Sequence, residues 1–379
     1  MPRTSVIFPI LAIVLVLAVL WFGLGRASGK IVIGVIGPLT GTASPYGSAH
    51  RNGIKLAVDQ LNSAGGINGK LIEGVFVDDA NNKIAAAELC RDLIYKNGAV
   101  SIIGGITSDN TMNIQRICEK ARIPVLTAVS TNPFITRVNF KYSFRCLSDD
   151  DIQATKLAQY TTGVMNLRRV AIIHDSNKYG SQGARTYAAV AKSMGQNIVG
   201  NEYYEAGAVN FKTQLEKIKA TNPDGLLVWG LVHEGALAVR QARELGIDIP
   251  IFGSDGIAPS TLLDLAGPAA EGIVLSFPYN PAQGGERGKI FIEAFRKAFG
   301  NEPDSFAAHG YDAMMLIAQA IRNSAGDGPS IRDALSRITV YDGVTGRGGF
   351  DATGNETRSV ELAQVKGGKF VPLSQGGSL

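Results

Sequence analysis

The sequence predicts an α/β protein of two Rossmann-like lobes, each built around a parallel β-sheet. From Ile31 onward, short apolar runs rich in β-branched residues alternate with segments whose apolar residues recur at helical spacing, as in a parallel sheet covered on both faces. At 379 residues the chain is too long for one ordinary core and suits two domains. The tripeptide Tyr-Gly-Ser also occurs twice, each time between an apolar run and a helical segment. We therefore expect two lobes of like construction that face one cleft.

The two tripeptides are Tyr46–Ser48 and Tyr179–Ser181. Each is expected to occupy a turn between a strand and a helix that begins at the glycine of the tripeptide. Open α/β sheets bind small ligands at such turns, beyond the carboxyl ends of their strands. The repeat therefore offers two aromatic side chains to a ligand between the lobes.

The first 29 residues are expected to be a signal peptide or a membrane anchor. Residues 4–25 carry no charge and are mostly Ile, Leu, Val and Ala, a length close to the roughly 20 residues that span a bilayer. Gly25-Arg26-Ala27 has the small-x-small form of a signal-peptidase site, which favours cleavage after Ala27. No cysteine follows the apolar run, so a lipoprotein anchor is not expected.

Strands are expected where apolar runs recur along the chain, and helices between them. The segments Ile54–Leu61 and Ala236–Leu245 repeat apolar residues at helical spacing, the second in a helix that starts near Glu234. The glycine-rich turn Ala64–Lys70 is expected to end the first helix in a left-handed cap. The expected strands are Ile31–Ile36, Leu71–Val77, Val100–Ile103, Val125–Thr127, Val170–His174, Ile198–Tyr203, Gly225–Trp229, Ile249–Phe252 and Ile273–Phe277.

Three places where the alternation breaks are expected to be passages between the lobes: Arg145–Asp151, Ser276–Asn280 and Tyr341–Gly349. Three passages make each lobe discontinuous in sequence and produce a three-stranded hinge. The first lobe is then expected to contain residues 30–147 and 278–344. The second is expected to contain residues 148–277 and 345–379.

Composition excludes several classes of function. The formal charge is only +4 and the basic residues are scattered among acids, so no nucleic-acid surface is expected. The sequence contains no nucleophile elbow, phosphate loop or zinc helix motif, and its four histidines lack metal-ligand spacing. His174-Asp175-Ser176 has the residue types of a catalytic triad, but neighbours on an extended chain point to opposite faces. We expect no enzyme, cofactor or metal site.

Three cysteines, Cys90, Cys118 and Cys146, allow at most one disulfide within the chain. All three lie in apolar-patterned segments, which favours three small buried side chains. Export would permit a disulfide without requiring one.

Candidate ligand-binding residues follow the expected strands. Ser108 precedes a helix expected to start near Asp109, and a hydroxyl with free N–H groups at a helix N-terminus can hold a carboxylate. Residues 129–131 follow the next strand and offer hydroxyls, N–H groups and a carbonyl. Asp255 follows a strand of the second half, where its carboxylate can pair with an ammonium. The alternatives are an ordinary helix cap, a polar loop and a turn residue.

These residues together resemble the type I periplasmic binding proteins that serve branched-chain amino acid ABC transporters, the leucine/isoleucine/valine-binding proteins. The resemblance runs from about Ile31 to Pro372. Its motifs are Ile33-Gly-Val-Ile-Gly-Pro-Leu-Thr-Gly41 with Tyr46-Gly47, the Asn62–Gly69 turn, Val77-Asp-Asp79, Ile103-Gly-Gly105, His174-Asp175 with Tyr179-Gly180, Arg240–Arg243 and Gly253–Gly256.

The resemblance implies a role for each candidate residue. Ser108 and Thr131 would hold the ligand carboxylate, while the Val129 carbonyl, the Thr131 hydroxyl and Asp255 would meet its ammonium. Ser130 belongs to the same loop, and the side-chain pocket would be lined by Tyr46, Ile106, Tyr179, Leu231 and Phe306. Asp255 is one methylene shorter than the glutamate often found at its position, and Leu231 replaces an aromatic residue of some relatives. Both differences put branched-chain specificity in question.

The function implied is capture of a small amino acid, branched-chain or otherwise apolar, by an extracytoplasmic protein that delivers it to an ABC transporter permease. We expect a periplasmic location, with contact to the membrane if the N-terminal segment is retained. The alternatives are a membrane-anchored ligand sensor, the same fold binding an amide, urea or a small organic acid, and a hydrolase.

Overall fold

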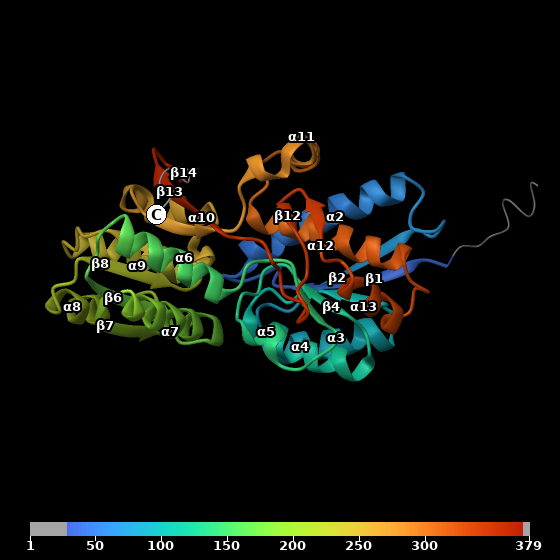
Figure 1. Ribbon diagram of the computed structural model, residues 1–379, viewed down its shortest axis with the longest axis horizontal. Coiled ribbons are helices and arrows are strands. Elements are labelled where there is room, and N and C mark those ends of the chain that lie inside the picture. Colours follow the sequence, from blue (N-terminus) through green and yellow to red (C-terminus); the bar gives the residue numbers. More distant parts are fainter. Residues whose placement is uncertain (1–28, 374–379) are drawn as a thin grey trace, which may run out of the picture.

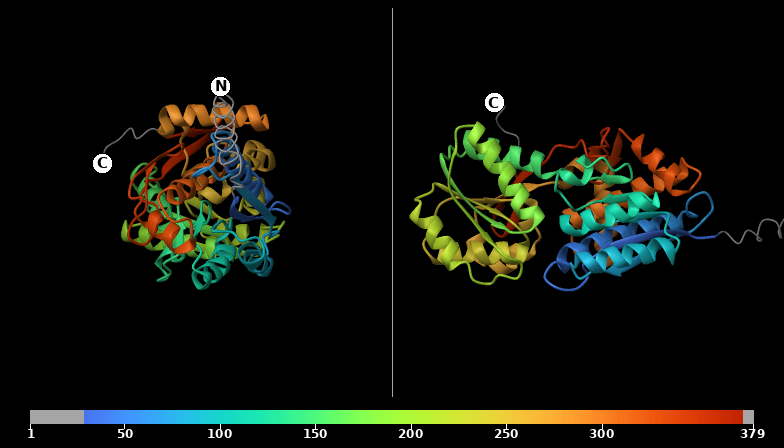
Figure 2. Two further views of the ribbon diagram at one scale, coloured as in Figure 1. Left: turned by 90° about the vertical axis from the view of Figure 1, so that its right-hand side faces the viewer. Right: turned by 90° about the horizontal axis from the view of Figure 1, so that it is seen from below.

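A computed structural model describes residues 29–373 of the chain. Two lobes lie side by side along the long axis of the molecule, each with one sheet between layers of helices (Figure 1). The view from below separates the two sheets and their helices (Figure 2). The predicted fold class, two α/β lobes with parallel sheets, is confirmed.

The first lobe contains a five-stranded parallel sheet of order β2-β1-β3-β4-β5. One face packs against α2, α12 and α13, and the other against α3 and α4, through two separate apolar clusters. The strands are β1 (Ile31–Gly37), β2 (Ile72–Asp78), β3 (Ser101–Ile103), β4 (Val125–Thr127) and β5 (Ser143–Arg145). The helices are α2 (Ser44–Ser63), α3 (Lys83–Tyr95), α4 (Ser108–Ala121), α5 (Phe134–Arg137), α11 (Gly285–Phe299), α12 (Ser305–Arg322) and α13 (Gly328–Ser336).

The second lobe contains a seven-stranded sheet of order β14-β13-β10-β9-β8-β6-β7. Helices α6 and α7 cover one face, and α8, α9 and α10 the other. The strands are β6 (Arg169–Asp175), β7 (Asn197–Tyr204), β8 (Gly225–Trp229), β9 (Ile251–Gly253), β10 (Val274–Phe277), β13 (Glu361–Lys366) and β14 (Lys369–Pro372). The helices are α6 (Asp150–Gly163), α7 (Lys178–Ser193), α8 (Lys212–Ala220), α9 (Val232–Glu244) and α10 (Thr261–Ala266).

The two sheets share one topology, which explains the repeated tripeptide. The order β7-β6-β8-β9-β10 repeats β2-β1-β3-β4-β5, so β6 corresponds to β1. In each sheet the first strand, β1 or β6, pairs with the next strand along the chain on one side and with the strand after that on its other side. Such a switch point opens a crevice at the carboxyl ends of the strands. Tyr46 and Tyr179 follow β1 and β6, and so occupy equivalent positions at these two crevices.

Within residues 29–373, three segments run between the two lobes. The first links β5 to α6, and the second links β10 to the 3₁₀ turn Pro281–Gly284. The third was expected at Tyr341–Gly349, a segment that contains the hairpin β11 (Tyr341–Gly343) and β12 (Gly346–Gly348). Phe350 then packs in the first-lobe core, so the chain crosses only between Phe350 and β13. We therefore propose that residues 345–356 belong to the first lobe.

Several local expectations also need correction. Helices α2 and α7 begin at Ser44 and Lys178, before the glycines of the two tripeptides. Helix α9 begins at Val232, two residues before the expected start. Strands β5, β13 and β14 were not predicted, and β13 and β14 add an antiparallel edge to the second sheet. The glycine turn behaves as expected, with left-handed backbone at Gly65 and Gly66.

Two expectations concern the ends of the chain and its cysteines. Within residues 29–373, no helix combines the length and apolar character needed to cross a bilayer. The N-terminal segment expected to be a signal peptide or anchor lies outside the described residues. Cys90, Cys118 and Cys146 are buried and free, as their apolar surroundings predict.

Candidate functional site

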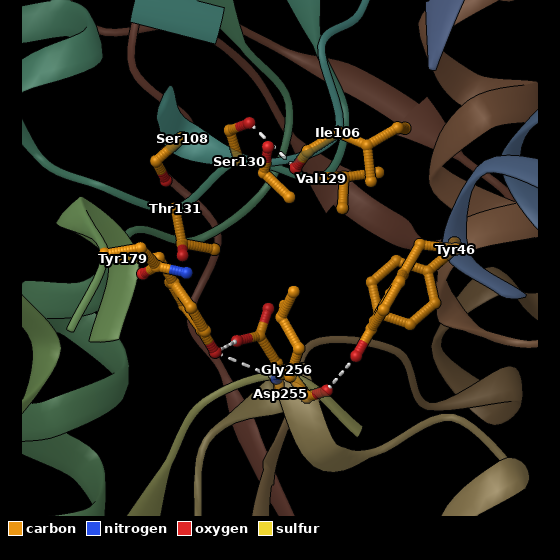
Figure 3. A pocket seen from close by; sticks show the side chains of 13 residues that line it. Tyr46, Ile106, Ser108, Val129, Ser130, Thr131, Tyr179, Asp255 and Gly256 are labelled. Atoms are coloured by element: carbon orange, nitrogen blue, oxygen red, sulfur yellow. Dashed lines mark hydrogen bonds between the residues drawn. The ribbon is translucent and has the colours of Figure 1, made fainter. Parts of the chain in front are cut away.

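A small cavity lies between the lobes, at the carboxyl ends of both sheets. All ten residues that the sequence singles out line it, together with Thr107, Asn177 and Gly256 (Figure 3). The ten are Tyr46, Ile106, Ser108, Val129, Ser130, Thr131, Tyr179, Leu231, Asp255 and Phe306. The lining residues come from both lobes, so a small ligand in this cavity would contact both.

One polar wall of the cavity is the N-terminus of α4, in the first lobe. Ser108 is the first residue of the helix, and the N–H of Thr111 is bonded to the carbonyl of Thr107. The backbone N–H groups that precede Thr111 in the helix have no acceptor within it, because no earlier helical carbonyl lies four residues before them. The Ser108 hydroxyl has one long contact, from the Asn132 N–H at 3.4 Å. Free N–H groups and this hydroxyl together make a cradle for an anion.

The loop after β4 supplies two hydroxyls, which differ in availability. Ser130 Oγ is used inside the first lobe, within 2.5 Å of Thr111 Oγ1 and 2.9 Å of the Ile106 carbonyl. Thr131 is 1% exposed and its Oγ1 has no partner among the described residues. A buried hydroxyl without a partner is costly. Thr131 is therefore the hydroxyl of this loop that a ligand can engage.

The opposing wall belongs to the second lobe and contains Asp255, in a 3₁₀ turn after β9. The Tyr179 hydroxyl lies 2.9 Å from Asp255 Oδ1 and accepts the N–H of Gly256 at 2.9 Å. Burial raises the pKa of the Asp255 carboxyl to about 6, against the lowering effect of the hydrogen bond from Tyr179. Tyr179, expected only as part of the side-chain pocket, thus also positions the acid.

A second acid, Asp150, lies behind Thr131 and was missed by the sequence analysis. Its N–H donates to the Thr131 carbonyl at 2.9 Å. Asp150 is fully buried, and both carboxylate oxygens lack a partner among the described residues. Burial raises its pKa well above the ordinary range, against the lowering effect of the neighbouring Thr131 side chain, and the charge of Asp255 adds to the rise. Three successive aspartates at a helix start suggest capping, and Asp149 does cap α6 by accepting from Ile152.

Tyr46 joins the two lobes across the cavity. Its hydroxyl donates to the Gly256 carbonyl at 2.5 Å and accepts the N–H of Val232 at 2.6 Å. Its ring packs edge-on against Phe306, with centroids 5.1 Å apart. Tyr46 and Phe306, from the first lobe, share one apolar cluster with second-lobe residues such as Tyr204. The lobes are therefore closed on each other in this structure.

The charge of the cavity is one-sided. None of the thirteen lining residues is Lys or Arg, whereas Asp255 lines the cavity and Asp150 lies beside it. The nearby guanidinium of Arg145 is bound to Asp149, at 3.3 Å. Anion-binding groups in the cavity are thus neutral N–H and hydroxyl groups. A matching ligand combines an anionic group with a positive charge.

Comparison with known proteins places this geometry in context. Residues 30–369 match the family model described as periplasmic binding protein. The chain is 29% identical over 331 residues to the leucine-, isoleucine-, valine-, threonine- and alanine-binding protein of Pseudomonas aeruginosa, covering 87% of this chain and 88% of that one.

Two solved structures show the same fold. The branched-chain amino acid transporter substrate binding protein of Streptococcus pneumoniae, in complex with isoleucine, has a TM-score of 0.86 at 29% identity and covers 91% of this chain and 99% of that one. A solute binding protein of an ABC transporter from R. palustris, in complex with benzoate, has a TM-score of 0.83 at 23% identity. It covers 91% of this chain and 96% of that one.

Proposed function

The chain belongs to the periplasmic binding protein family, and on that premise we propose that it captures a small zwitterionic amino acid with an apolar side chain. Relatives of this chain are named as an amino acid-binding protein and as a transporter substrate binding protein. The observation that carries the proposal is the pairing of a neutral anion cradle in one lobe with the carboxyl group of Asp255 on the opposing wall of the same cavity.

In the proposed complex, the ligand carboxylate binds the N-terminus of α4 and the Ser108 hydroxyl. Its ammonium lies between the Val129 carbonyl, the Thr131 hydroxyl and Asp255, with Asp150 as a second acid behind Thr131. Charge-assisted hydrogen bonds of this kind are about twice as strong as neutral ones. Burial favours the neutral form of both acids in the empty cavity, and an arriving ammonium favours the ionised form.

Ligand selection by size is proposed for the apolar walls. Ile106, Leu231 and Phe306 line the cavity together with the ring of Tyr46. Most apolar pockets discriminate side chains that differ by one methylene only by about 1–3 kcal/mol. We therefore propose a ligand range of several apolar amino acids.

A small organic acid is the second candidate, because a protein of the same fold is known with benzoate. The absence of Lys and Arg among the lining residues argues against it, since an isolated carboxylate would then share the cavity with Asp255. Two like charges in a buried site repel, and one of them must be neutralised. The zwitterion avoids this cost.

Delivery to an ABC transporter permease, outside the cytoplasm, completes the proposed function. Closure of both lobes around the ligand presents surfaces of the two lobes in one arrangement, which a membrane partner can recognise. A ligand shifts the equilibrium toward closure only as far as it prefers the closed state.

Thermal-shift measurements test this proposal. The protein is unfolded and refolded to remove bound ligand, then melted with L-amino acids, their amides, urea and benzoate. A ligand at 100 times its Kd stabilises the native state by about 2.7 kcal/mol. We expect apolar L-amino acids to raise the Tm by several degrees. A rise with benzoate or an amide, and with no amino acid, would contradict the proposal.

A further inference from the structure

We propose that Cys90 and Cys118 form a structural disulfide in the exported protein, while Cys146 remains a free thiol. Cys90 lies in α3 and Cys118 in α4, which pack side by side on the same face of the first sheet (Figure 1). Their sulfur atoms are 3.7 Å apart, although the residues are 28 positions apart in sequence. A disulfide requires the two sulfurs to approach to about 2.05 Å.

Among the described residues, no third cysteine belongs to the apolar cluster around these two sulfurs. Both side chains are 0% exposed and belong to one apolar cluster with residues such as Leu93 and Ile114. Cys146 is also buried, but it belongs to the cluster on the opposite face of the sheet, where its sulfur donates to the Thr127 carbonyl at 3.7 Å. The fold therefore selects one of the three possible pairings.

The disulfide must form during folding, before α3 and α4 pack together and bury the two sulfur atoms. The sulfur atoms are fully buried in the folded protein, and burial raises the pKa of the Cys118 thiol well above its usual value, which disfavours the thiolate that attacks a disulfide. An oxidant with a reactive disulfide, such as a thiol oxidoreductase or oxidised glutathione, supplies the chemistry. One protein thiolate attacks that disulfide and expels a thiolate; the second protein thiolate then attacks the mixed disulfide. The oxidant leaves as two thiols, having gained two electrons.

The disulfide would secure a helix that carries the proposed ligand cradle. The N-terminal end of α4 is already tied to the loop before α3, because Thr107 Oγ1 donates to Asn81 at 2.7 Å and Asn110 to Asp79 at 2.8 Å. Cys118 lies near the other end of α4, where no equivalent polar tie joins it to α3. A bridge there would hold both ends of the helix against its neighbour.

The test is oxidative refolding of the full chain. Reduced, unfolded protein is refolded in a mixture of reduced and oxidised glutathione, without ligand, and remaining thiols are alkylated in denaturant. We expect one alkylated thiol, at Cys146, and a peptide that contains Cys90 joined to Cys118. Three alkylated thiols, or a bridge to Cys146, would overturn the inference. Because this experiment needs neither ligand nor export, its failure leaves the proposed amino acid binding untouched.

Two matched variants and one unmutated comparison complete the test. Cys146→Ala should leave no alkylated thiol, and Cys118→Ala should leave two. Reduction should lower the Tm of the wild type and of Cys146→Ala by about 5 °C, because the bridge restricts the unfolded chain. It should leave the Tm of Cys118→Ala unchanged. Equal Tm values for the oxidised and reduced wild type would contradict a stabilising bridge, whatever the variants do.

Discussion

At the residue scale, the site is distinguished by two buried acids in unequal surroundings. Asp255 shares a hydrogen bond with Tyr179, whereas Asp150 has no partner among the described residues. Burying a carboxylate without a hydrogen bond or an opposite charge destabilises the folded protein. We therefore expect such a carboxylate to gain a partner when the protein binds its ligand. In our account the ligand ammonium compensates both acids.

Replacement of one acid tests this account. Asp255→Asn keeps the size of the side chain and removes its charge, so we expect amino acid affinity to fall by more than ~1 kcal/mol, about fivefold or more in Kd. Titration calorimetry measures this change in Kd. Asp264→Asn, at an exposed position on α10, is the matched control and should bind as the wild type does. An unchanged Kd for Asp255→Asn would make Asp255 a turn residue.

The raised pKa of Asp255 predicts how binding and stability depend on pH. Its folded value of about 6 exceeds its ordinary 3.8, so in the empty protein this group contributes stability fully below pH 3.8 and loses it as pH rises through 6. Binding of an ammonium has the opposite dependence, because it requires the carboxylate. We expect affinity to fall below pH 6, by up to about tenfold per pH unit.

Calorimetry between pH 7.5 and 5 checks this dependence, with Asp255→Asn as the comparison. The variant should show a shallower fall in affinity, because one titrating group has been removed. Equal slopes for the two proteins would assign the dependence to another group, with Asp150 the nearest.

At the element scale, the glycine of each Tyr-Gly-Ser turn allows a helix to start against the end of a strand. A Cβ at Gly47 would lie 1.9 Å from the Pro38 carbonyl oxygen, and one at Gly180 would lie 2.2 Å from that of Asp175. In both lobes the backbone of the first helical turn thus packs on the carboxyl end of the first strand, at Pro38 just after β1 and at Asp175, the last residue of β6. The preceding tyrosine is thereby directed into the cavity.

We expect Gly180→Ala to displace the first turn of α7, and Tyr179 with it. Because a backbone oxygen cannot yield as a flexible side chain can, the variant should lower both the Tm and amino acid affinity. Thermal melts and calorimetry measure the two effects. Gly200→Ala is the control, since its Cβ would meet its nearest neighbour at an ordinary 3.5 Å. Wild-type affinity in Gly180→Ala would show that the turn does not position Tyr179.

At the scale of the whole molecule, Tyr46 links closure to the site. It is held by the first lobe, but both hydrogen bonds of its hydroxyl go to the second, at Gly256 and Val232. These bonds exist only while the lobes are closed. The tyrosine therefore contributes to the free-energy difference between open and closed forms as well as to the wall of the cavity.

Tyr46→Phe retains the ring and removes both hydrogen bonds, so we expect the open form to gain population. Small-angle X-ray scattering at subsaturating ligand should give a larger radius of gyration than the wild type, and Kd should rise about tenfold or more, for the loss of about 1 kcal/mol per bond. Tyr203→Phe, on an exposed tyrosine, should change neither. Identical scattering curves for Tyr46→Phe and the wild type would refute this role.

The sequence predicts those features that depend on local pattern. Apolar runs locate nine strands and the cavity-lining residues that follow them, because parallel strands all end at the same edge. Strands β5 and β13 were missed, since β5 is Ser143-Phe144-Arg145, with one apolar residue, and β13 contains Gln364 and ends in Lys366. The role of Asp150 depends on burial by distant segments, and the interlobe bonds of Tyr46 depend on closure. Neither the burial of Asp150 nor the interlobe hydrogen bonds of Tyr46 can be predicted from the residues next to them in sequence.

The central claim is that the cavity recognises an ammonium and a carboxylate in one ligand. Calorimetry with leucine, with 4-methylpentanoate, which lacks the ammonium, and with 3-methylbutylamine, which lacks the carboxylate, tests it most directly. All three carry the same apolar side chain. The account predicts heat of binding for leucine and none for either analogue at the same concentration. Binding of 4-methylpentanoate as tight as that of leucine would contradict it.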